Sequence, residues 1–258
     1  MSEATVKMTV ENRVAWIEIC NERKRNAFTH NMTRQLDEHL HAADQDRQVR
    51  VVVIRGQGEV AFSAGHDLSE LTDNPGDAAD EDETAPFLYP RKMRKPVIAA
   101  VNGFAYAGGL ILAQSCDIRI ASSNAKFAGT GAKLGLVPIG GQLSLLPALM
   151  APGIALEIMF TGEALTADRA LTAGFVNQVV ESSELEKTVR DLAERIAANA
   201  PLIVETIKEA VWAGVMNGFG MADAIERFAS RHLDSGPDAL EGVRAFSEKR
   251  APVFKGDE

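Results

Sequence analysis

Hydrophobic and polar positions alternate near the start of the chain and then give way to other patterns. The alternation in "KMTVENRVAWIEI" predicts two short strands joined by a turn at residues 11–13. Residues 31–46 carry apolar side chains at helical spacing, and "VRVVVIRG" is a continuous β-branched run typical of a strand buried on both faces. Further strands are predicted within residues 95–103, 117–122 and 175–180, with a helix over 107–114. Strands that alternate with helices predict an α/β layer fold.

Two segments depart from this alternation. Residues 72–84, "TDNPGDAADEDET", are rich in Asp, Glu, Pro and Gly and contain almost no large apolar side chain, which predicts a mobile surface loop. From Ser182 onward helical patterns dominate, with breaks at residue 201, near 214–220 and at 236–237. The amphipathic stretch "GMADAIERFASRHL" must cover a core or a partner. We therefore predict a core over residues 1–198 and a helical region over 199–258.

Composition excludes several classes of protein. The 258 residues suffice for one large α/β domain with a helical appendage. The formal net charge of -9 argues against a broad nucleic-acid surface, which needs clustered Lys and Arg. No run of about 18 apolar residues exists and "MSEATVKM" lacks the pattern of an export signal, so we expect a cytoplasmic protein without a membrane role. Cys20 and Cys116 lack disulfide-framework or metal-site spacing and are expected to be reduced thiols in or near the core.

Two segments combine a predicted strand, a glycine loop and the expected start of a helix. In "VVVIRGQGEVAFSAGHDLSEL" Gly65 precedes His66 and Asp67, and in "VIAAVNGFAYAGGLILA" Gly108 and Gly109 open the helix. A helix start exposes unpaired backbone N–H groups and the positive end of the helix dipole. Two such donors that converge on one point form an oxyanion hole. The alternative is that these glycines only make tight turns between strand and helix.

Several further segments carry a resemblance to a known family. They are "NERKRNAF", "AFSAGHDLSEL", "KPVIAAVNGFAYAGGLILAQSCDIRIAS", "AKFAGTGAKLGLVP", "LEIMFTGEALTADRALTAGFVNQVV" and "EGVRAFSEKRAPVF". In this order, over nearly the whole chain, the sequence resembles the crotonase superfamily, the enoyl-CoA hydratase and isomerase family. The resemblance implies an α/β fold built as a spiral of ββα units with a C-terminal helical trimerisation region, and an assembly of trimers or hexamers.

The same resemblance implies chemistry on an acyl-CoA thioester. Its carbonyl oxygen would accept hydrogen bonds from the backbone amides of His66 and Gly108, and the imidazole of His66 is not expected to take part. Deprotonation, addition and decarboxylation beside a thioester all place negative charge on this oxygen, so one oxyanion hole can serve several reactions. No metal is implied, and no cofactor other than the coenzyme A of the substrate.

The sequence departs from the family at the acid/base positions. Hydratases of the family place one glutamate three residues after the donor glycine and a second in a later "F-x-x-P-E" stretch. Ile111 and Gly131 stand at these positions, and Ile139 or Gly140 at a third position that carries an acid in some isomerases. A hydratase needs a base to activate water and an acid to protonate carbon, so standard hydration is not expected. The possible substitutes are Glu70, Tyr89, Tyr106, Gln114, Thr130 and Glu163.

Basic clusters suggest where coenzyme A binds in this acidic protein. By resemblance, "NERKR" after the first hairpin and "SEKR" near the end of the chain can contact its phosphates, the latter sometimes across a subunit boundary. The residues expected to contact the substrate are Lys24, Arg25, Ala27, Ala64, Asp67, Leu68 and Lys249.

Three functions remain open at this point. The first is an acyl-CoA-processing enzyme of hydratase or isomerase type with unusual proton carriers. The second is a non-catalytic acyl-CoA binding protein that retains the pocket and the oxyanion hole. The third is a thioester decarboxylase, because "FSAGHDLSEL" resembles the corresponding segment of methylmalonyl-CoA decarboxylase.

Overall fold

The computed structural model describes residues 4–67, 69–70 and 81–256 and contains two sheets. The larger has the order β1-β2-β3-β5-β7-β10, with an antiparallel β1–β2 hairpin and otherwise parallel pairing. Its strands are β1 (Thr5–Glu11), β2 (Val14–Cys20), β3 (Val51–Gly56), β5 (Val97–Val101), β7 (Ile118–Ser122) and β10 (Gln178–Val180). The predicted hairpin and strands are confirmed, with Asn12 and Arg13 at positive φ in the turn.

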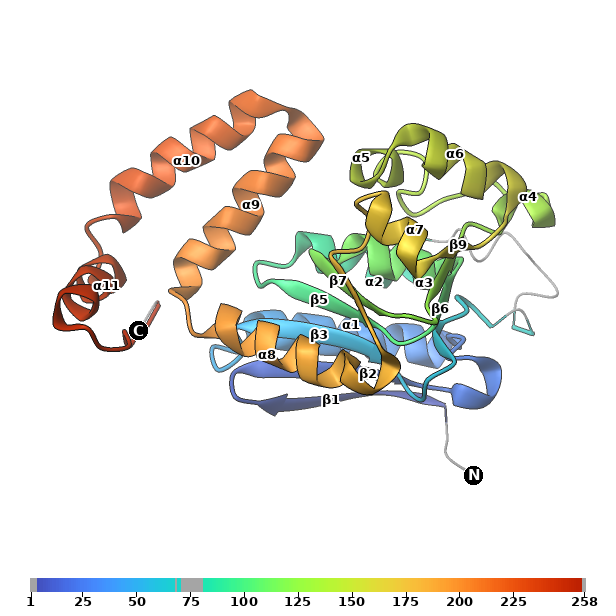
Figure 1. Cartoon of the computed structure of the whole chain (residues 1–258), viewed down its shortest axis with the longest axis horizontal. Helices are drawn as coiled ribbons and strands as arrows, with labels where there is room; N and C mark the ends of the chain where they lie inside the picture. Colours follow the sequence, from blue (N-terminus) through green and yellow to red (C-terminus); the bar gives the residue numbers. More distant parts are fainter. Residues whose placement is uncertain (1–3, 68, 71–80, 257–258) are drawn as a thin grey trace.

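Strand β3 is buried on both faces, as its β-branched sequence predicts. Val52 and Ile54 belong to one hydrophobic cluster, and Val51 and Val53 belong to a second on the opposite face. Helix α8 (Leu185–Ala197) covers the second cluster, as Figure 1 shows. The parallel strand is therefore enclosed between two layers, which is the usual environment of a parallel sheet.

The smaller sheet was not anticipated. It has the order β4-β6-β8-β9, formed by β4 (Ala61–Ser63), β6 (Phe104–Tyr106), β8 (Lys126–Ala128) and β9 (Leu165–Thr166). Strands of two or three residues are too short to show an alternating pattern, so the sequence gives no signal for them. After each of β3, β5 and β7 the chain enters this second sheet and then a helix, which produces the expected spiral of ββα units.

Most of the remaining helices lie around the two sheets. They are α1 (His30–Gln45), α2 (Glu81–Lys92), α3 (Gly108–Ser115), α4 (Gly131–Leu134), α5 (Leu146–Leu149), α6 (Pro152–Thr161) and α7 (Ala167–Thr172). The predicted loop over residues 72–84 is wrong for residues 81–84, which begin α2; residues 72–80 lie outside the described part of the chain. Pro86 and Pro90 inside α2 hid its helical character, because proline normally ends a helix.

Three C-terminal helices extend away from the sheets in Figure 1: α9 (Pro201–Asn217), α10 (Phe219–Leu233) and α11 (Pro237–Glu248). We call them the arm. The predicted helix breaks are confirmed, because α9 and α11 begin at prolines and Gly218 separates α9 from α10. The buried Lys208 joins α9 to the core through Pro90 O at 2.7 Å and an ion pair with Asp117 at 2.9 Å.

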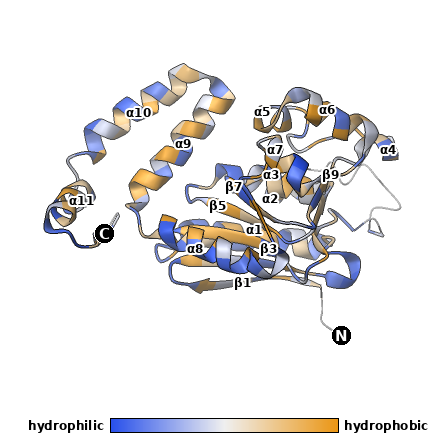
Figure 2. Ribbon diagram, viewed as in Figure 1, coloured by the Kyte–Doolittle hydropathy of each residue, from blue (hydrophilic) through white to orange (hydrophobic). Residues whose placement is uncertain are grey.

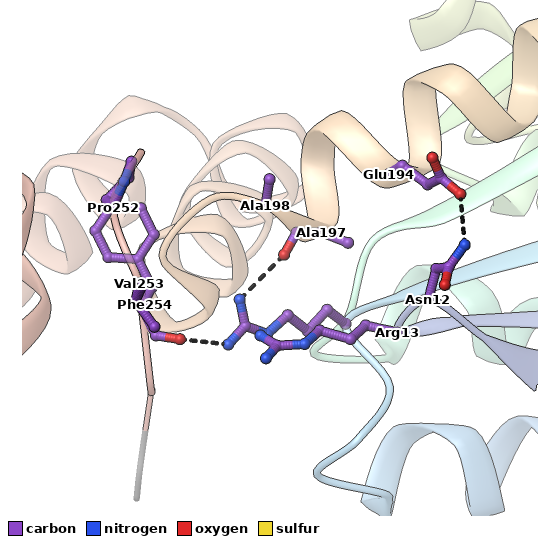
Figure 3. A pocket seen from close by; sticks show the side chains of 9 residues that line it. Asn12, Arg13, Glu194, Ala197, Ala198, Pro252, Val253 and Phe254 are labelled. Atoms are coloured by element: carbon purple, nitrogen blue, oxygen red, sulfur yellow. Dashed lines mark hydrogen bonds between the residues drawn. The ribbon is translucent and has the colours of Figure 1, made fainter. Parts of the chain in front are cut away.

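A second attachment holds the end of the arm. Arg50 donates hydrogen bonds to Ala197 O at 3.0 Å and to Phe254 O at 2.6 Å, so the last turn of α8 and the C-terminal tail share one guanidinium group. A cavity of about 380 Å³ lies at this place. Asn12, which also lines it, donates a hydrogen bond to Glu194, as Figure 3 shows. The arm is thus attached to the core near both of its ends.

Two expectations from composition can be compared with the fold. Cys20 and Cys116 are both free and buried, as predicted. Burial raises the pKa of Cys116 to about 12, so its thiol stays protonated at neutral pH. Within the described residues, no helix has the length and apolar character needed to cross a bilayer.

Candidate active site

The loop before α1 and the loop after β4 are joined side by side by backbone hydrogen bonds. Ala64 N donates to Arg25 O at 3.0 Å, Phe28 N donates to Gly65 O at 2.8 Å, and Asp67 N donates to Phe28 O at 2.7 Å. The buried side chain of Asn26 supports this arrangement, since its amide donates to Ala61 O at 2.7 Å. Residues from two distant parts of the sequence therefore meet at one edge of the smaller sheet.

These bonds bring together most of the predicted substrate contacts. Lys24, Arg25 and Ala27 lie in a loop that is bonded to the loop of Ala64 and Asp67. Leu68 lies outside the described residues. Lys249 does not join the group within the chain: it follows α11, which lies at the opposite end of the molecule from α3 in Figure 1.

Gly65 and Gly108 are in direct backbone contact. A Cβ on Gly65 would lie 2.7 Å from Gly108 N, and a Cβ on Gly108 would lie 3.1 Å from Gly65 Cα. Gly65 also has a φ of +92°, which L side chains rarely adopt. Only glycine at residue 65 lets the loop lie this close to the N-terminus of α3.

The contact brings the loop that carries His66 against the N-terminus of α3. In the described part of the chain, neither His66 N nor Gly108 N donates to a backbone acceptor. For Gly108 this follows from its position, because the first residues of a helix have no intrahelical acceptor. The positive end of the α3 dipole adds to the field here. A free N–H group and the dipole both favour negative charge at this end of α3.

Ile111 occupies the first position that lacks a glutamate. Its side chain is 4% exposed and belongs to the main hydrophobic cluster. It lies against Gly140, where a Cβ would be 2.6 Å from Ile111 Cδ1. Two of the three positions singled out in the sequence are thus adjacent in the fold, and both are apolar.

Gly131, at the second such position, is the first residue of α4. Its carbonyl accepts a hydrogen bond from Leu136 N at 2.9 Å, and a Cβ on Gly131 would lie 2.7 Å from Leu136 O. A glutamate here would force the backbone of the following loop to move.

The imidazole of His66 is enclosed by helix α2. Nε2 lies 3.3 Å from Glu83 O and 3.8 Å from the Glu83 carboxylate, and the ring packs on Phe87 with centroids 4.9 Å apart. Nδ1 faces Gly108, because a Cβ on Gly108 would lie 3.5 Å from this nitrogen. Burial lowers the pKa of His66 below its ordinary value, although the hydrogen bond and charge of Glu83 act in the opposite direction.

Asp67 forms an ion pair that orders the loop. Lys24 Nζ lies 2.5 Å from Asp67 Oδ2, and Ser69 Oγ donates to Asp67 Oδ1 at 2.7 Å. Burial opposes ionisation of Asp67, but the bonds from Lys24 and Ser69 outweigh it and hold the pKa of this carboxyl below its usual value. Lys24 is therefore paired with Asp67. Its side chain is still 53% exposed, so it can also face a ligand.

Among the possible substitutes, three are directed elsewhere. Tyr89 bonds to Asp44 at 3.5 Å, Glu70 accepts from the backbone of His30 at 2.8 Å, and the exposed Glu163 pairs with Lys133 at 2.9 Å.

The other three lie near the helices around the site. Gln114 is fully buried and donates to Gly140 O at 2.6 Å. Thr130 precedes α4 without capping it through its side chain. Burial raises the pKa of Tyr106, while the charge of Arg25 lowers it and the charge of Glu163 raises it.

Two residues of the site were missed in the sequence. Glu83 fell within the predicted acidic loop, and Phe87 follows it on the same unrecognised helix. The available signal was the apolar stretch "APFLYP", in which Phe87 is completely buried and packs on Phe28 with centroids 4.9 Å apart.

Comparison with known proteins shows the family to which the chain belongs. A model of the enoyl-CoA hydratase/isomerase family matches residues 9–257. The short-chain-enoyl-CoA hydratase of Clostridium acetobutylicum is 37% identical over 93% of each chain, and the carnitinyl-CoA dehydratase of Proteus mirabilis is 38% identical over 92% of this chain and 94% of the relative. The crystal structure of an enoyl-CoA hydratase from Bacillus anthracis superposes with a TM-score of 0.94 at 32% identity, over 98% of this chain and all of that one. The chain belongs to the enoyl-CoA hydratase/isomerase family of the crotonase superfamily.

Proposed function

We propose that this protein is an enzyme that stabilises the enolate of an acyl-CoA thioester with the backbone amides of His66 and Gly108. It is supported by the contact between Gly65 and Gly108, which brings the loop that carries His66 against the N-terminus of α3. Negative charge that develops on the thioester oxygen is then stabilised by fixed dipoles that need no reorganisation. No cofactor is required beyond the coenzyme A of the substrate.

Standard hydration of an enoyl thioester is not the reaction that this site supports. Ile111 is buried among apolar side chains, and Gly131 has no side chain to move a proton. Loss of one well-placed acid or base typically costs 10²- to 10⁴-fold in rate, on the order of what general acid–base catalysis contributes. Crotonyl-CoA should therefore bind but be hydrated very slowly.

Decarboxylation of a malonyl-type thioester is the second candidate. The buried Ile111 beside Gly140 favours it, because an apolar surrounding disfavours a carboxylate relative to carbon dioxide. This reaction also ends in an enolate on the same oxygen, and it needs no strong base. A non-catalytic acyl-CoA binding protein would use the same donors without turnover.

One experiment separates these functions. Enoyl-, hydroxyacyl- and malonyl-type CoA thioesters are tested for binding by calorimetry and for turnover by absorbance and mass spectrometry. Turnover of one class assigns the reaction, whereas tight binding of several without turnover selects the binding protein. If none of the thioesters binds, acyl-CoA processing through this site is wrong. Gly153→Ala serves as a control, since a Cβ at that position meets nothing within 4 Å.

We also propose that the arm forms the interface of a trimer, or of a hexamer made from two trimers. Large apolar side chains of the arm are exposed: Ile207 and Val211 at 58% each, Phe219 at 83% and Phe246 at 86%. Figure 2 shows hydrophobic residues along α9. Exposed apolar surface in this amount is costly in water and favours an interface. In such an assembly Lys249 can face coenzyme A bound to a neighbouring subunit.

A further inference from the structure

The ring of His66 lies between Gly108 and the carboxylate of Glu83. One edge, with Nδ1, faces Gly108, and the other edge, with Nε2, faces Glu83. His66 has a side chain that is 12% exposed, so the ring is enclosed but not sealed from solvent. This imidazole belongs to the same residue as one of the two predicted oxyanion donors.

The surroundings of Nε2 decide which ring nitrogen carries the proton. Its neighbour at 3.3 Å is the carbonyl oxygen of Glu83, which can only accept a hydrogen bond. The Glu83 carboxylate, 3.8 Å away, favours the same arrangement. Nε2 therefore holds the hydrogen, and Nδ1 presents its lone pair toward Gly108.

Glu83 is itself fixed in place. His30 Nδ1 lies 2.6 Å from Glu83 Oε1, which leaves Oε2 on the side of His66. Oε2 is buried and has no hydrogen-bond partner among the described residues. A buried carboxylate oxygen of this kind can stabilise a positive charge that forms on the neighbouring ring.

We propose that His66 Nδ1 is the proton acceptor for the bound acyl group and that Glu83 is the positioning residue that orients the ring. The inference rests on the proposed function, because it requires a thioester held at His66 N and Gly108 N. The imidazole then replaces the carboxylates that are missing at Ile111 and Gly131.

The step is a proton transfer. The Cα–H bond of the acyl group breaks and its proton passes to Nδ1. The electron pair of that bond forms the double bond of the enolate, while the carbonyl π pair moves onto the oxygen held by the two amides. The resulting imidazolium keeps its Nε2–H directed at Glu83, and return of a proton from Nδ1 to Cα restores the thioester.

The charges around the ring suit this role at neutral pH. Burial lowers the pKa of His66, the charge of Glu83 from α2 raises it, and His30 from α1 lowers it. Because the net shift is downward, the ring is unprotonated at pH 7 and able to accept a proton.

Exchange of the α-hydrogens of butyryl-CoA in D₂O tests the proposal, since it needs only a base and the oxyanion hole. The wild-type protein should introduce deuterium at Cα of butyryl-CoA, and mass spectrometry measures this incorporation. His66→Gln, which keeps the backbone amide, should lower the exchange rate by at least about 10²-fold while calorimetry shows butyryl-CoA affinity within about twofold of the wild type. The matched control His232→Gln, on the exposed face of α10, should leave both unchanged.

The pH profile supplies a readout that does not depend on how well the variant folds. Wild-type exchange should rise with one ionisation whose midpoint lies below the ordinary histidine pKa of about 6.5. Glu83→Gln should move the midpoint to lower pH, because it removes the charge that favours imidazolium. Undiminished exchange in His66→Gln, or a midpoint that Glu83→Gln does not move, overturns the inference. Butyryl-CoA that binds without any exchange overturns it too, whereas failure of all CoA thioesters to bind refutes the proposed function itself.

Discussion

The side chain of Ile111 fills the space that a side chain on Gly140 would need. Gly140 has a φ of +63°, and its missing Cβ would lie 2.6 Å from Ile111 Cδ1 and 2.7 Å from Ile111 Cγ2. An isoleucine at the first vacant acid position and a glycine at the third are thus parts of one packing arrangement.

Gly140→Ala should lower the free energy of unfolding by more than the strain of alanine at a positive φ alone would cause. The strain of alanine at positive φ costs about 1 kcal/mol or more, and the overlap with Ile111 adds about 1–3 kcal/mol. Gly135→Ala is the matched control, because its φ is +69° and a Cβ there meets nothing within 4 Å. Urea unfolding should show the larger loss for Gly140→Ala. In the background Ile111→Ala the two glycine substitutions should cost the same; an unchanged difference would argue against the packing explanation.

Gly65→Ala should disable the oxyanion hole. A Cβ there meets Gly108 N at 2.7 Å, so the loop must move and His66 N leaves its position. Loss of one such donor costs about 10²- to 10³-fold in rate. The measurement is the rate of whichever thioester reaction the substrate panel identifies, together with the red shift of a bound conjugated acyl-CoA, which reports carbonyl polarisation. Gly153→Ala should leave both at their wild-type values. A Gly65→Ala protein with full rate and full red shift would contradict the assignment of the donors.

Asp67 should contribute to stability in a pH-dependent way. Its pKa is held below the usual value by Lys24 and Ser69 against the effect of burial. The contribution is therefore present above the unfolded pKa of about 3.9 and is lost as the pH falls through the lower folded pKa. We expect about 1 kcal/mol, because Lys24 is half-exposed and solvent screens the pair. Asp67→Asn should reduce the difference in unfolding free energy between pH 7 and pH 3, while Asp168→Asn, at an exposed position in α7, should not. Equal pH dependence in both variants would speak against the ion pair as the cause.

The arm should control assembly. Ile207→Asp with Val211→Asp places two charges on the apolar face of α9, where each side chain is 58% exposed in the isolated chain. If this face is the interface, the charges are desolvated on association and the trimer dissociates. Light scattering should then change from a trimer or hexamer mass to a monomer mass at micromolar concentration. Val60→Asp, at an exposed position outside the arm, should leave the mass unchanged. A wild-type protein that is already monomeric would refute the proposed interface.

The sequence predicted the larger sheet well because its strands are long enough to show a pattern. The β-branched residues of β3 match its burial on both faces. The alternation in β1 and β2 located both strands, although β2 is buried on both faces and not on one. The contact between Gly65 and Gly108 could not be derived from local pattern, since it joins residues whose approach depends on both sheets. The resemblance paired the neighbouring His66 with Gly108, and the structure shows the backbone contact beside them, where Gly65 has a positive φ.

The surroundings of His66 were the part that sequence reasoning could not reach. Glu83 stood in an acidic stretch where a loop was the simplest expectation, and Pro86 obscured the helix that carries it. The ring environment also depends on His30 at the start of α1, far away in the chain. Pattern analysis assigns elements one at a time, whereas the electrostatics of a buried ring come from all the elements around it.

Through its bonds to Ala197 O and Phe254 O, Arg50 makes the arm a closed loop and not a free tail. The chain leaves the core beside this guanidinium group and returns to it. If the backbone of the arm is cut, for example at Gly218 between α9 and α10, the ion pair of Lys208 would still hold the first fragment. The bond from Arg50 to Phe254 O would still hold the second fragment. Cleavage and detachment are then separate events. The arm can keep its shape after the chain is cut, as long as Arg50 stays bonded to Phe254 O.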